Sequence, residues 1–130
     1  MRILKTDKSG IIKAFPELQI KRNWWPIIPK DNAVYYYLEE NNTPLCFVGT
    51  IINGDELSVE GLYASKEHKS ATAVFEIIEW IGKTYADKHI KIYVINDIAL
   101  WGWLRIGFRV KKTKKMKYWT AYWIERPKII

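Results

Sequence analysis

The spacing of apolar residues along the chain predicts strands in the first half and a helix near the middle. In the first half, short runs rich in apolar and β-branched residues are bounded by Asn, Gly and Pro, as in strands joined by tight turns. The expected strands cover residues 2–5, 33–39, 45–52 and 56–64. Turns are expected at residues 41–44 and at Asn53-Gly54-Asp55, where Asn-Gly is a strong hairpin signal. The last three strands should therefore form an antiparallel meander.

The period of the apolar residues changes after Ser70. An apolar stripe with helical spacing follows, and charged residues occupy the opposite side. The stripe consists of Val74, Ile77, Ile78, Ile81 and Tyr85. This pattern predicts a helix from about Ala71 to Lys88, with Ser70 or Thr72 as its N-cap. Shorter helical patterns cover residues 98–105 and residues 9–18, the second interrupted by Pro16.

The remaining apolar runs complete a sheet. Residues 90–95 are mainly apolar, which predicts a central strand covered on both faces. Residues 108–112 and 117–124 predict two strands around a lysine-rich turn, whereas residues 22–29, with two prolines, should be irregular. The order of elements predicts an α/β (α+β) fold, with a mixed, mostly antiparallel sheet and helices on both faces. A chain of this length is expected to form a single domain, residues 1–130.

Composition narrows the classes of protein that the chain can belong to. The single cysteine, Cys46, lies in an apolar run and is expected to be inert, and a lone cysteine suits a reducing compartment. No window is long and apolar enough to span a membrane, and the first residues lack the apolar core of a signal peptide. A cytoplasmic protein is therefore expected. No Cys/His spacing predicts a metal site, and no glycine-rich nucleotide-binding loop is present.

The chain is basic, with a formal net charge of +7. Such a charge suits a nucleic acid, an acidic protein or a polyanionic cofactor, but it also serves solubility alone. Much of it is concentrated near the C-terminus in a segment expected to be a hairpin tip. The lysines in that segment are Lys111, Lys112, Lys114 and Lys115. With the aromatic residues of 22–25 they could contact phosphates and stack on bases, or they could simply protect a sheet edge from aggregation.

One motif points to a family. Asn96 and Ala99 follow the strand at residues 92–95 with the spacing Asn-x-x-Ala, and Gly107-Phe108 comes after seven further residues. This motif resembles the second half of the GCN5-related N-acetyltransferase (GNAT) fold. The resemblance is strongest from Glu56 to Ile124. The short, Trp-rich chain also looks like versions of this fold that bacteriophages encode.

The resemblance implies acetyl-CoA as cofactor. In the family, the loop after the fourth strand and the helix start that follows bind the pyrophosphate through backbone N–H groups. The matching residues are Lys69, Ser70, Ala71, Thr72 and Ala73, with Ser70 and Thr72 where glycines are usual. Backbone groups of Leu62 and Ala64 would pair with the pantetheine arm beside a bulge at Gly61, and Asn96 would reach the arm from the other side. Helix capping is the alternative role of Ser70 and of Asn96.

Acyl transfer to an amine needs a base for the amine and a proton for the leaving thiolate. Glu60 is the candidate base because it lies on the strand that would face the thioester; the alternative is a solvated surface carboxylate. Trp103 stands where the family has a tyrosine as general acid, and an indole cannot supply a proton at neutral pH. The tyrosines considered as substitutes are Tyr63, Tyr93, Tyr118 and Tyr122, and the tryptophans that could line the cleft or fill the core are Trp101, Trp103, Trp119 and Trp123.

Three functions remain open at this point. The first is an acetyl-CoA-dependent N-acyltransferase that acts on a small amine, a protein lysine or a modified base. The second is a catalytically degenerate protein of the same fold that binds nucleic acid or has a structural role, for example in a phage virion. The third is a phage enzyme that modifies DNA. An enzyme needs the loop at Lys69 to take phosphate, whereas a binding protein needs only the basic surface.

Overall fold

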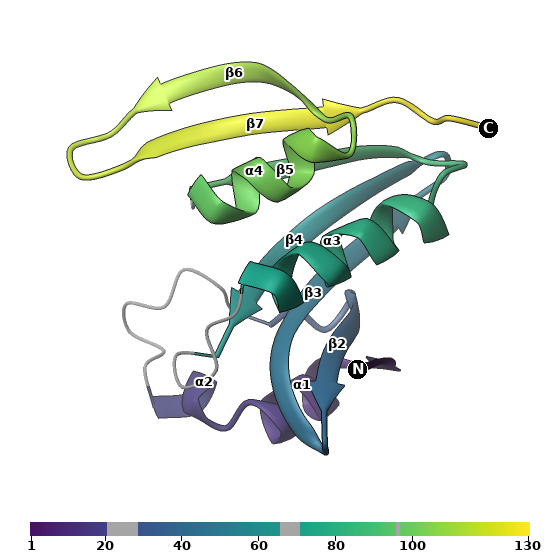
Figure 1. Ribbon diagram of the computed structural model, residues 1–130, viewed down its shortest axis with the longest axis vertical. Coiled ribbons are helices and arrows are strands. Elements are labelled where there is room, and N and C mark those ends of the chain that lie inside the picture. Colours follow the sequence, from purple (N-terminus) through teal and green to yellow (C-terminus); the bar gives the residue numbers. More distant parts are fainter. Residues whose placement is uncertain (21–28, 66–70, 96) are drawn as a thin grey trace.

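A seven-stranded sheet forms the centre of the protein, in a computed structural model that describes residues 1–20, 29–65, 71–95 and 97–130 (Figure 1). The strand order is β1-β2-β3-β4-β5-β7-β6, and only the β4–β5 pair is parallel. The strands are β1 (Arg2–Thr6), β2 (Val34–Glu40), β3 (Thr43–Asn53), β4 (Glu56–Ala64), β5 (His89–Val94), β6 (Arg109–Lys115) and β7 (Thr120–Arg126). The predicted mixed, mostly antiparallel sheet is confirmed.

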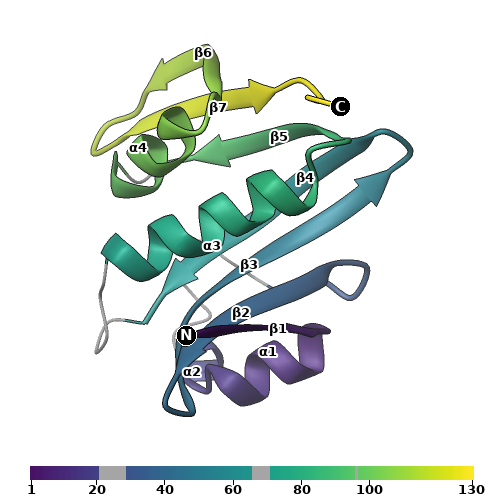
Figure 2. The ribbon, with the colours of Figure 1, turned by 45° about the vertical axis from the view of Figure 1, so that its right-hand side comes forward.

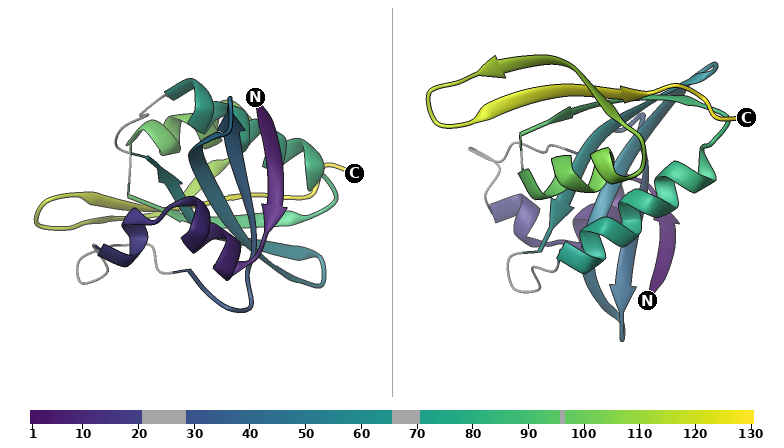
Figure 3. Two further views of the ribbon diagram at one scale, coloured as in Figure 1. Left: turned by 90° about the horizontal axis from the view of Figure 1, so that it is seen from below. Right: turned by 45° about the horizontal axis from the view of Figure 1, so that its top comes forward.

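Helices lie on both faces of this sheet, also as predicted. The helices α1 (Lys8–Ala14) and α2 (Glu17–Ile20) lie on one face, and α3 (Ala71–Thr84) and α4 (Asp97–Arg105) lie on the other (Figure 3). The larger apolar core is between the sheet and α3 with α4, and it buries the predicted stripe of α3 from Val74 to Ile81. A smaller core with Ile11, Phe15 and Tyr35 lies under α1.

The two predicted hairpin turns are present. Asn41 and Asn42 have φ angles of 51° and 64°, a left-handed pair that matches the twist of the flanking strands. The turn is shorter than predicted, because residues 43 and 44 already belong to β3. Gly54 has a φ of 65° and lies between β3 and β4, so the Asn-Gly signal located this hairpin correctly.

One prediction about α3 was wrong, and of its two predicted N-caps one is excluded. The helix ends at Thr84 rather than Lys88, because the guanidinium of Arg126 from β7 binds the carbonyl oxygens of Gly82 and Tyr85 at 2.8 and 2.9 Å. A cation at these carbonyls takes the place of a further helical turn. Thr72 lies within the helix and so is not its N-cap, whereas Ser70, the other candidate, is outside the described residues.

Two predictions about the C-terminal strands were also wrong. Strand β5 is buried on one face only, because α1 packs over β2 and β3 and leaves Lys91 and Tyr93 exposed. The lysine-rich segment is not a hairpin tip but the edge strand β6, and the turn to β7 covers residues 116–119. All residues of β6 are exposed. We call the side of β5, β7 and β6 that carries Tyr93 the open face.

Candidate functional site

The parallel strands β4 and β5 pair over only part of their length. Glu56–Val59 pair with His89–Ile92, and no strand of the described chain pairs with the rest of β4 on this edge. Figure 2 shows the two strands diverging beyond that point. Among the described residues, this edge of β4 at Leu62 and Ala64 therefore has no strand partner.

A β-bulge lies where the strands part. Gly61 pairs with Gly49 and Val59 pairs with Thr50, so that Glu60 is the extra residue on β4. The expected bulge is present, and it lies at Glu60, next to Gly61. A bulge re-aims the side chains next to it. Here Glu60 lies on the sheet side that carries α1, near the open face.

The Glu60 carboxylate forms an ion pair that the sequence did not reveal. Its Oε2 accepts a hydrogen bond from the Lys30 Nζ at 2.7 Å, and its side chain is 23% exposed. The backbone N–H of Lys30 donates to the Tyr35 hydroxyl at 2.7 Å, which fixes Lys30 over the sheet. Burial raises the pKa of Tyr35. Glu60 is therefore neither fully solvated nor deeply buried.

A cavity of about 310 Å³ adjoins Glu60 on the same side of the sheet. Tyr93 and Trp123 line it as a pair, with ring centroids 4.9 Å apart and planes at 61°. The other residues around it are Ser58, Val59, Glu60, Lys91, Ile92, Lys111, Ile124 and Glu125. The cavity thus combines aromatic walls with carboxylates and ammonium groups from four neighbouring strands.

Ion pairs organise the rim of this cavity. Glu125 contacts the Nε2 of His89 at 3.0 Å and the Nζ of Lys111 at 3.3 Å. Desolvation raises the pKa of Glu125, but the hydrogen bonds from Lys111 and His89 outweigh it and hold the pKa below its usual range. Lys91 pairs with Glu56 at 3.0 Å. These contacts fix the rim in place around Glu60.

The predicted cofactor residues lie in two neighbouring places. Leu62 and Ala64 lie on the part of β4 that β5 leaves unpaired. Ala71 and Thr72 are exposed at the start of α3, and Ala73 is buried there. Cys46 joins the two places, because it pairs with Ala64 and its Sγ donates to the Ala73 carbonyl at 3.6 Å. The other predicted members, Lys69, Ser70 and Asn96, lie outside the described residues, as does most of the segment 22–29.

The four tryptophans considered for the cleft have different environments. Trp103 is fully buried and packs on Phe108 with ring centroids 5.0 Å apart, so it belongs to the core. Trp123 lines the cavity beside Glu60. Trp101 and Trp119 are 65% and 46% exposed, and neither fills the core. The residue at the position of the family tyrosine is thus unsuited to proton transfer by burial as well as by chemistry.

The four tyrosines considered as general acids also lie in different environments. Tyr93 lines the cavity that contains Glu60. Tyr63 is buried and donates to Glu17 at 3.0 Å, Tyr122 packs against the core under α3, and Tyr118 is 79% exposed in the β6–β7 turn. Tyr93 is therefore the member of this set that shares a cavity with the candidate base.

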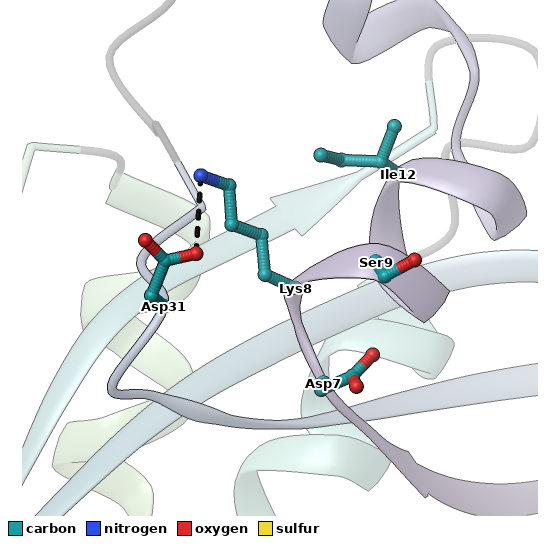
Figure 4. A pocket seen from close by; sticks show the side chains of 5 residues that line it. All are labelled: Asp7, Lys8, Ser9, Ile12 and Asp31. Atoms are coloured by element: carbon teal, nitrogen blue, oxygen red, sulfur yellow. Dashed lines mark ion pairs between the residues drawn. The ribbon is translucent and has the colours of Figure 1, made fainter.

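A second cavity of about 350 Å³ lies at the start of α1 (Figure 4). Lys8 and Asp31 face each other across it with 3.4 Å between Nζ and Oδ1, and Ser9 and Ile12 complete its lining. Asp7 caps α1 by accepting a hydrogen bond from the Gly10 N–H at 2.9 Å. Helix capping and a surface ion pair therefore explain the polar residues around this cavity.

Solved structures share this arrangement across almost the whole chain. The ribosomal-protein-S18-alanine N-acetyltransferase from Escherichia coli is 12% identical, with a TM-score of 0.70 over 99% of this chain and 96% of that one. The aminoglycoside 6′-N-acetyltransferase from Enterococcus faecium is 10% identical, with a TM-score of 0.70 over 100% and 98%. An N-acetyltransferase from Staphylococcus aureus Mu50 is 11% identical, with a TM-score of 0.71 over 100% of both chains. Other matches are described as members of the GNAT family. The chain has the GNAT fold.

The likeness to GNAT structures is one of fold. No protein-family model and no curated protein sequence matches the chain. None of the helices in the described part of the chain has the length and apolar character needed to cross a membrane.

Proposed function

We propose that the chain is an N-acyltransferase that uses acetyl-CoA and an amine, with Glu60 as general base. The observation that carries the proposal is the place of Glu60, the bulged residue at which β4 leaves β5. A carboxylate there lies between an open strand edge, where a donor can bind, and a cavity with aromatic walls, where an acceptor can bind. The GNAT fold of the chain supports this choice of reaction class.

The residues present fit the cofactor. Leu62 and Ala64 offer backbone groups on the unpaired edge of β4. The first turn of α3 contains no acidic residue, and the start of a helix is a favourable place for an anion. From the sequence, Lys69 and Ser70 add a charge and a hydroxyl just before this turn. When bound, acetyl-CoA would supply an acyl group activated as a thioester.

Glu60 would take the proton that the acceptor amine must lose. In the free protein its carboxylate is held by the Lys30 ammonium at 2.7 Å. This pair is partly exposed, with the Lys30 side chain 51% accessible, so its net stabilisation is at most about 1 kcal/mol. An acceptor ammonium can therefore replace Lys30 at low cost. Lys30 marks the position of the acceptor cation in this proposal.

Tyr93 would supply the proton that Trp103 cannot. Its hydroxyl is a donor, its ring lines the cavity beside Glu60, and it projects from β5 just beyond the last residue paired with β4. Trp103, by contrast, is buried in the core. Glu60 on β4 would thus accept a proton, and Tyr93 on β5 would donate one.

The test is the rate of acetyl transfer to a panel of amines, measured by the release of free thiol. The panel follows the acceptors of proteins with this fold: a peptide with N-terminal alanine, an aminoglycoside and spermidine. Glu60→Gln should lower kcat by about 100-fold or more while the KM for acetyl-CoA stays the same. The matched control is Glu56→Gln, which removes a carboxylate on the same strand that is also paired with a lysine. Equal rates for Glu60→Gln and the control would remove Glu60 from the mechanism.

The burial of Trp103 favours one second candidate, a non-catalytic protein of this fold, such as a phage protein with a binding or structural role. Such a protein would transfer no acyl group to any amine of the panel. Under that function, Glu60 and Lys30 would be a surface ion pair only, and their joint replacement by Gln and Met would leave every binding property unchanged.

A further inference from the structure

The hairpin of β6 and β7 extends away from the body of the protein beyond α4 (Figure 1). Strand β6 forms the edge of the sheet, and every residue in it is exposed. No helix of the described chain packs on the open face of this hairpin, because the helices on that side contact strands β1 to β4. The hairpin therefore presents its open face and its edge to a partner.

Most cations of β6 and the β6–β7 turn lack an anionic partner among the described residues. Lys111 is bound to Glu125, but the other basic residues of β6 and the turn form no ion pair among the described residues. They are Arg109, Lys112, Lys114, Lys115 and Lys117. In the backbone register of the two strands, three of these cations lie opposite residues of β7: Arg109 opposite Glu125, Lys112 opposite Trp123 and Lys114 opposite Ala121. Residues that lie opposite each other on neighbouring strands project on the same side of a sheet. A row of cations thus lies along the outer edge of the open face.

Aromatic rings lie beside this row. Trp123 pairs with Tyr93, and the Lys112 Nζ lies 5.1 Å from the centroid of the Trp123 ring. In the turn, Tyr118 and Trp119 are 79% and 46% exposed, and the Lys117 Nζ lies 5.3 Å from the Tyr118 ring centroid. Exposed Trp and Tyr next to unpaired lysines are the two components of a surface on which bases stack while cations contact the phosphates.

We propose that the open face of the β6–β7 hairpin binds single-stranded nucleic acid. The unpaired cations would contact the backbone phosphates, and Trp119, Tyr118 and Trp123 would stack on bases. A duplex offers the charges but hides the faces of its bases, and an acidic protein segment has no use for stacking rings. A second copy of the chain would bring the same lysines against one another. The single strand is the occupant that uses both the charge and the rings.

This proposal does not depend on acyl transfer. The surface is built from β6, β7 and their turn, whereas acetyl-CoA is assigned to β4 and the start of α3. Binding is therefore measured with no acetyl-CoA present, and its failure would leave the proposed reaction untouched. If both hold, a strand on this hairpin would lead toward the cavity beside Glu60, which Trp123 also lines.

The test is fluorescence anisotropy of a labelled oligothymidylate of about 15 nucleotides, at low and at physiological salt. The wild-type protein should bind, and the logarithm of its affinity should fall with the logarithm of salt concentration with a slope of about −2 to −3.5, as expected for three to five phosphate contacts. An oligouridylate of equal length shows whether the 2′-hydroxyl matters. Hairpin duplex DNA and heparin serve as polyanions without accessible base faces.

Two variants separate charge from stacking. Lys112→Glu with Lys114→Glu should weaken binding by about tenfold or more and flatten the salt slope. Trp119→Ala should weaken binding by about fivefold or more without changing the slope, because it removes a stacking ring and no charge. The matched controls are Lys83→Glu on α3 and Trp101→Ala on α4, which alter an exposed lysine and an exposed tryptophan on the helices of the opposite face of the sheet.

The outcomes decide the proposal. Loss of binding in the hairpin variants, with the controls at wild-type affinity, supports it. Tighter binding of duplex or heparin than of oligothymidylate, or wild-type affinity of Trp119→Ala, would show that charge alone acts and would overturn the assignment to single strands. Absence of binding at low salt would overturn it as well. Circular dichroism of each variant confirms that the fold is retained.

Discussion

Replacing Arg126 by Met should destabilise the fold strongly, because this cation ties the last part of β7 to the end of α3. Arg126 is 4% exposed. Its Nη1 donates to the Gly82 carbonyl at 2.8 Å and its Nη2 to the Tyr85 carbonyl at 2.9 Å, with a longer contact of 3.4 Å to the Lys88 carbonyl. Burial lowers the pKa of Arg126, but a guanidinium remains charged at every pH at which the protein folds.

The size of the effect follows from these contacts. A hydrogen bond to a charged group contributes about 1.5–3 kcal/mol, so the two short bonds set a range of about 3–6 kcal/mol. Methionine fills the same space and avoids the desolvation of a cation, which offsets part of that range. We expect a loss of about 3 kcal/mol in the free energy of unfolding, or about 10 °C in Tm. Arg126→Lys should lose about half as much, because an ammonium cannot span both carbonyls.

Urea unfolding followed by circular dichroism measures this loss. The control is Arg105→Met, because Arg105 is exposed and its guanidinium lies over the Phe75 ring, 4.9 Å from the centroid. This control should change the free energy of unfolding by about 1 kcal/mol or less. A loss below about 1 kcal/mol for Arg126→Met would refute the reasoning, since it would mean that water satisfies the α3 carbonyls as well as the guanidinium does.

Three further predictions concern single residues. Burial raises the pKa of the Cys46 thiol to about 12, so iodoacetamide at mildly alkaline pH should modify Cys46 only after unfolding; rapid labelling of the native protein would contradict this. Glu125→Gln should lower stability by about 1 kcal/mol or less near neutral pH. Because the folded pKa of Glu125 is depressed, the difference in stability between the wild type and Glu125→Gln should vanish as the pH falls through that pKa. A difference that stays the same at low pH in urea titrations would refute this prediction. Lys69→Glu should weaken coenzyme A binding about tenfold in calorimetry with the fold intact, and equal affinity would exclude the phosphate loop.

The local pattern of the sequence was sufficient for most elements of the fold. Strand β4 has the predicted bounds, because it starts after the Asn53-Gly54 hairpin and ends before polar loop residues. The apolar stripe located α3, but not its end. That end depends on Arg126, which is 44 residues from Gly82 in the chain, and no local period carries such information. For the same reason the exposed side of β5 was missed, since coverage depends on where α1 packs.

The candidate site was predicted in part. Glu60 was singled out because it lies on the strand expected to face the thioester, and the structure has it at the point where β4 and β5 part. Its role as base stays a prediction. Lys30 was missed, since it is 30 residues away from Glu60 and follows a proline-rich segment with no recognisable pattern. The exclusion of Trp103 as an acid followed from its chemistry alone, whereas the role proposed for Tyr93 needed the cavity.

Calorimetric titration with acetyl-CoA, at low and at physiological salt, tests the central claim most directly. The open edge of β4 and the start of α3 should bind the cofactor with a micromolar Kd at both salt concentrations, with Leu62 and Ala64 contributing backbone groups that salt does not screen. No heat of binding at either concentration would contradict the account, because without bound acetyl-CoA there is no thioester for the amine that Glu60 deprotonates to attack.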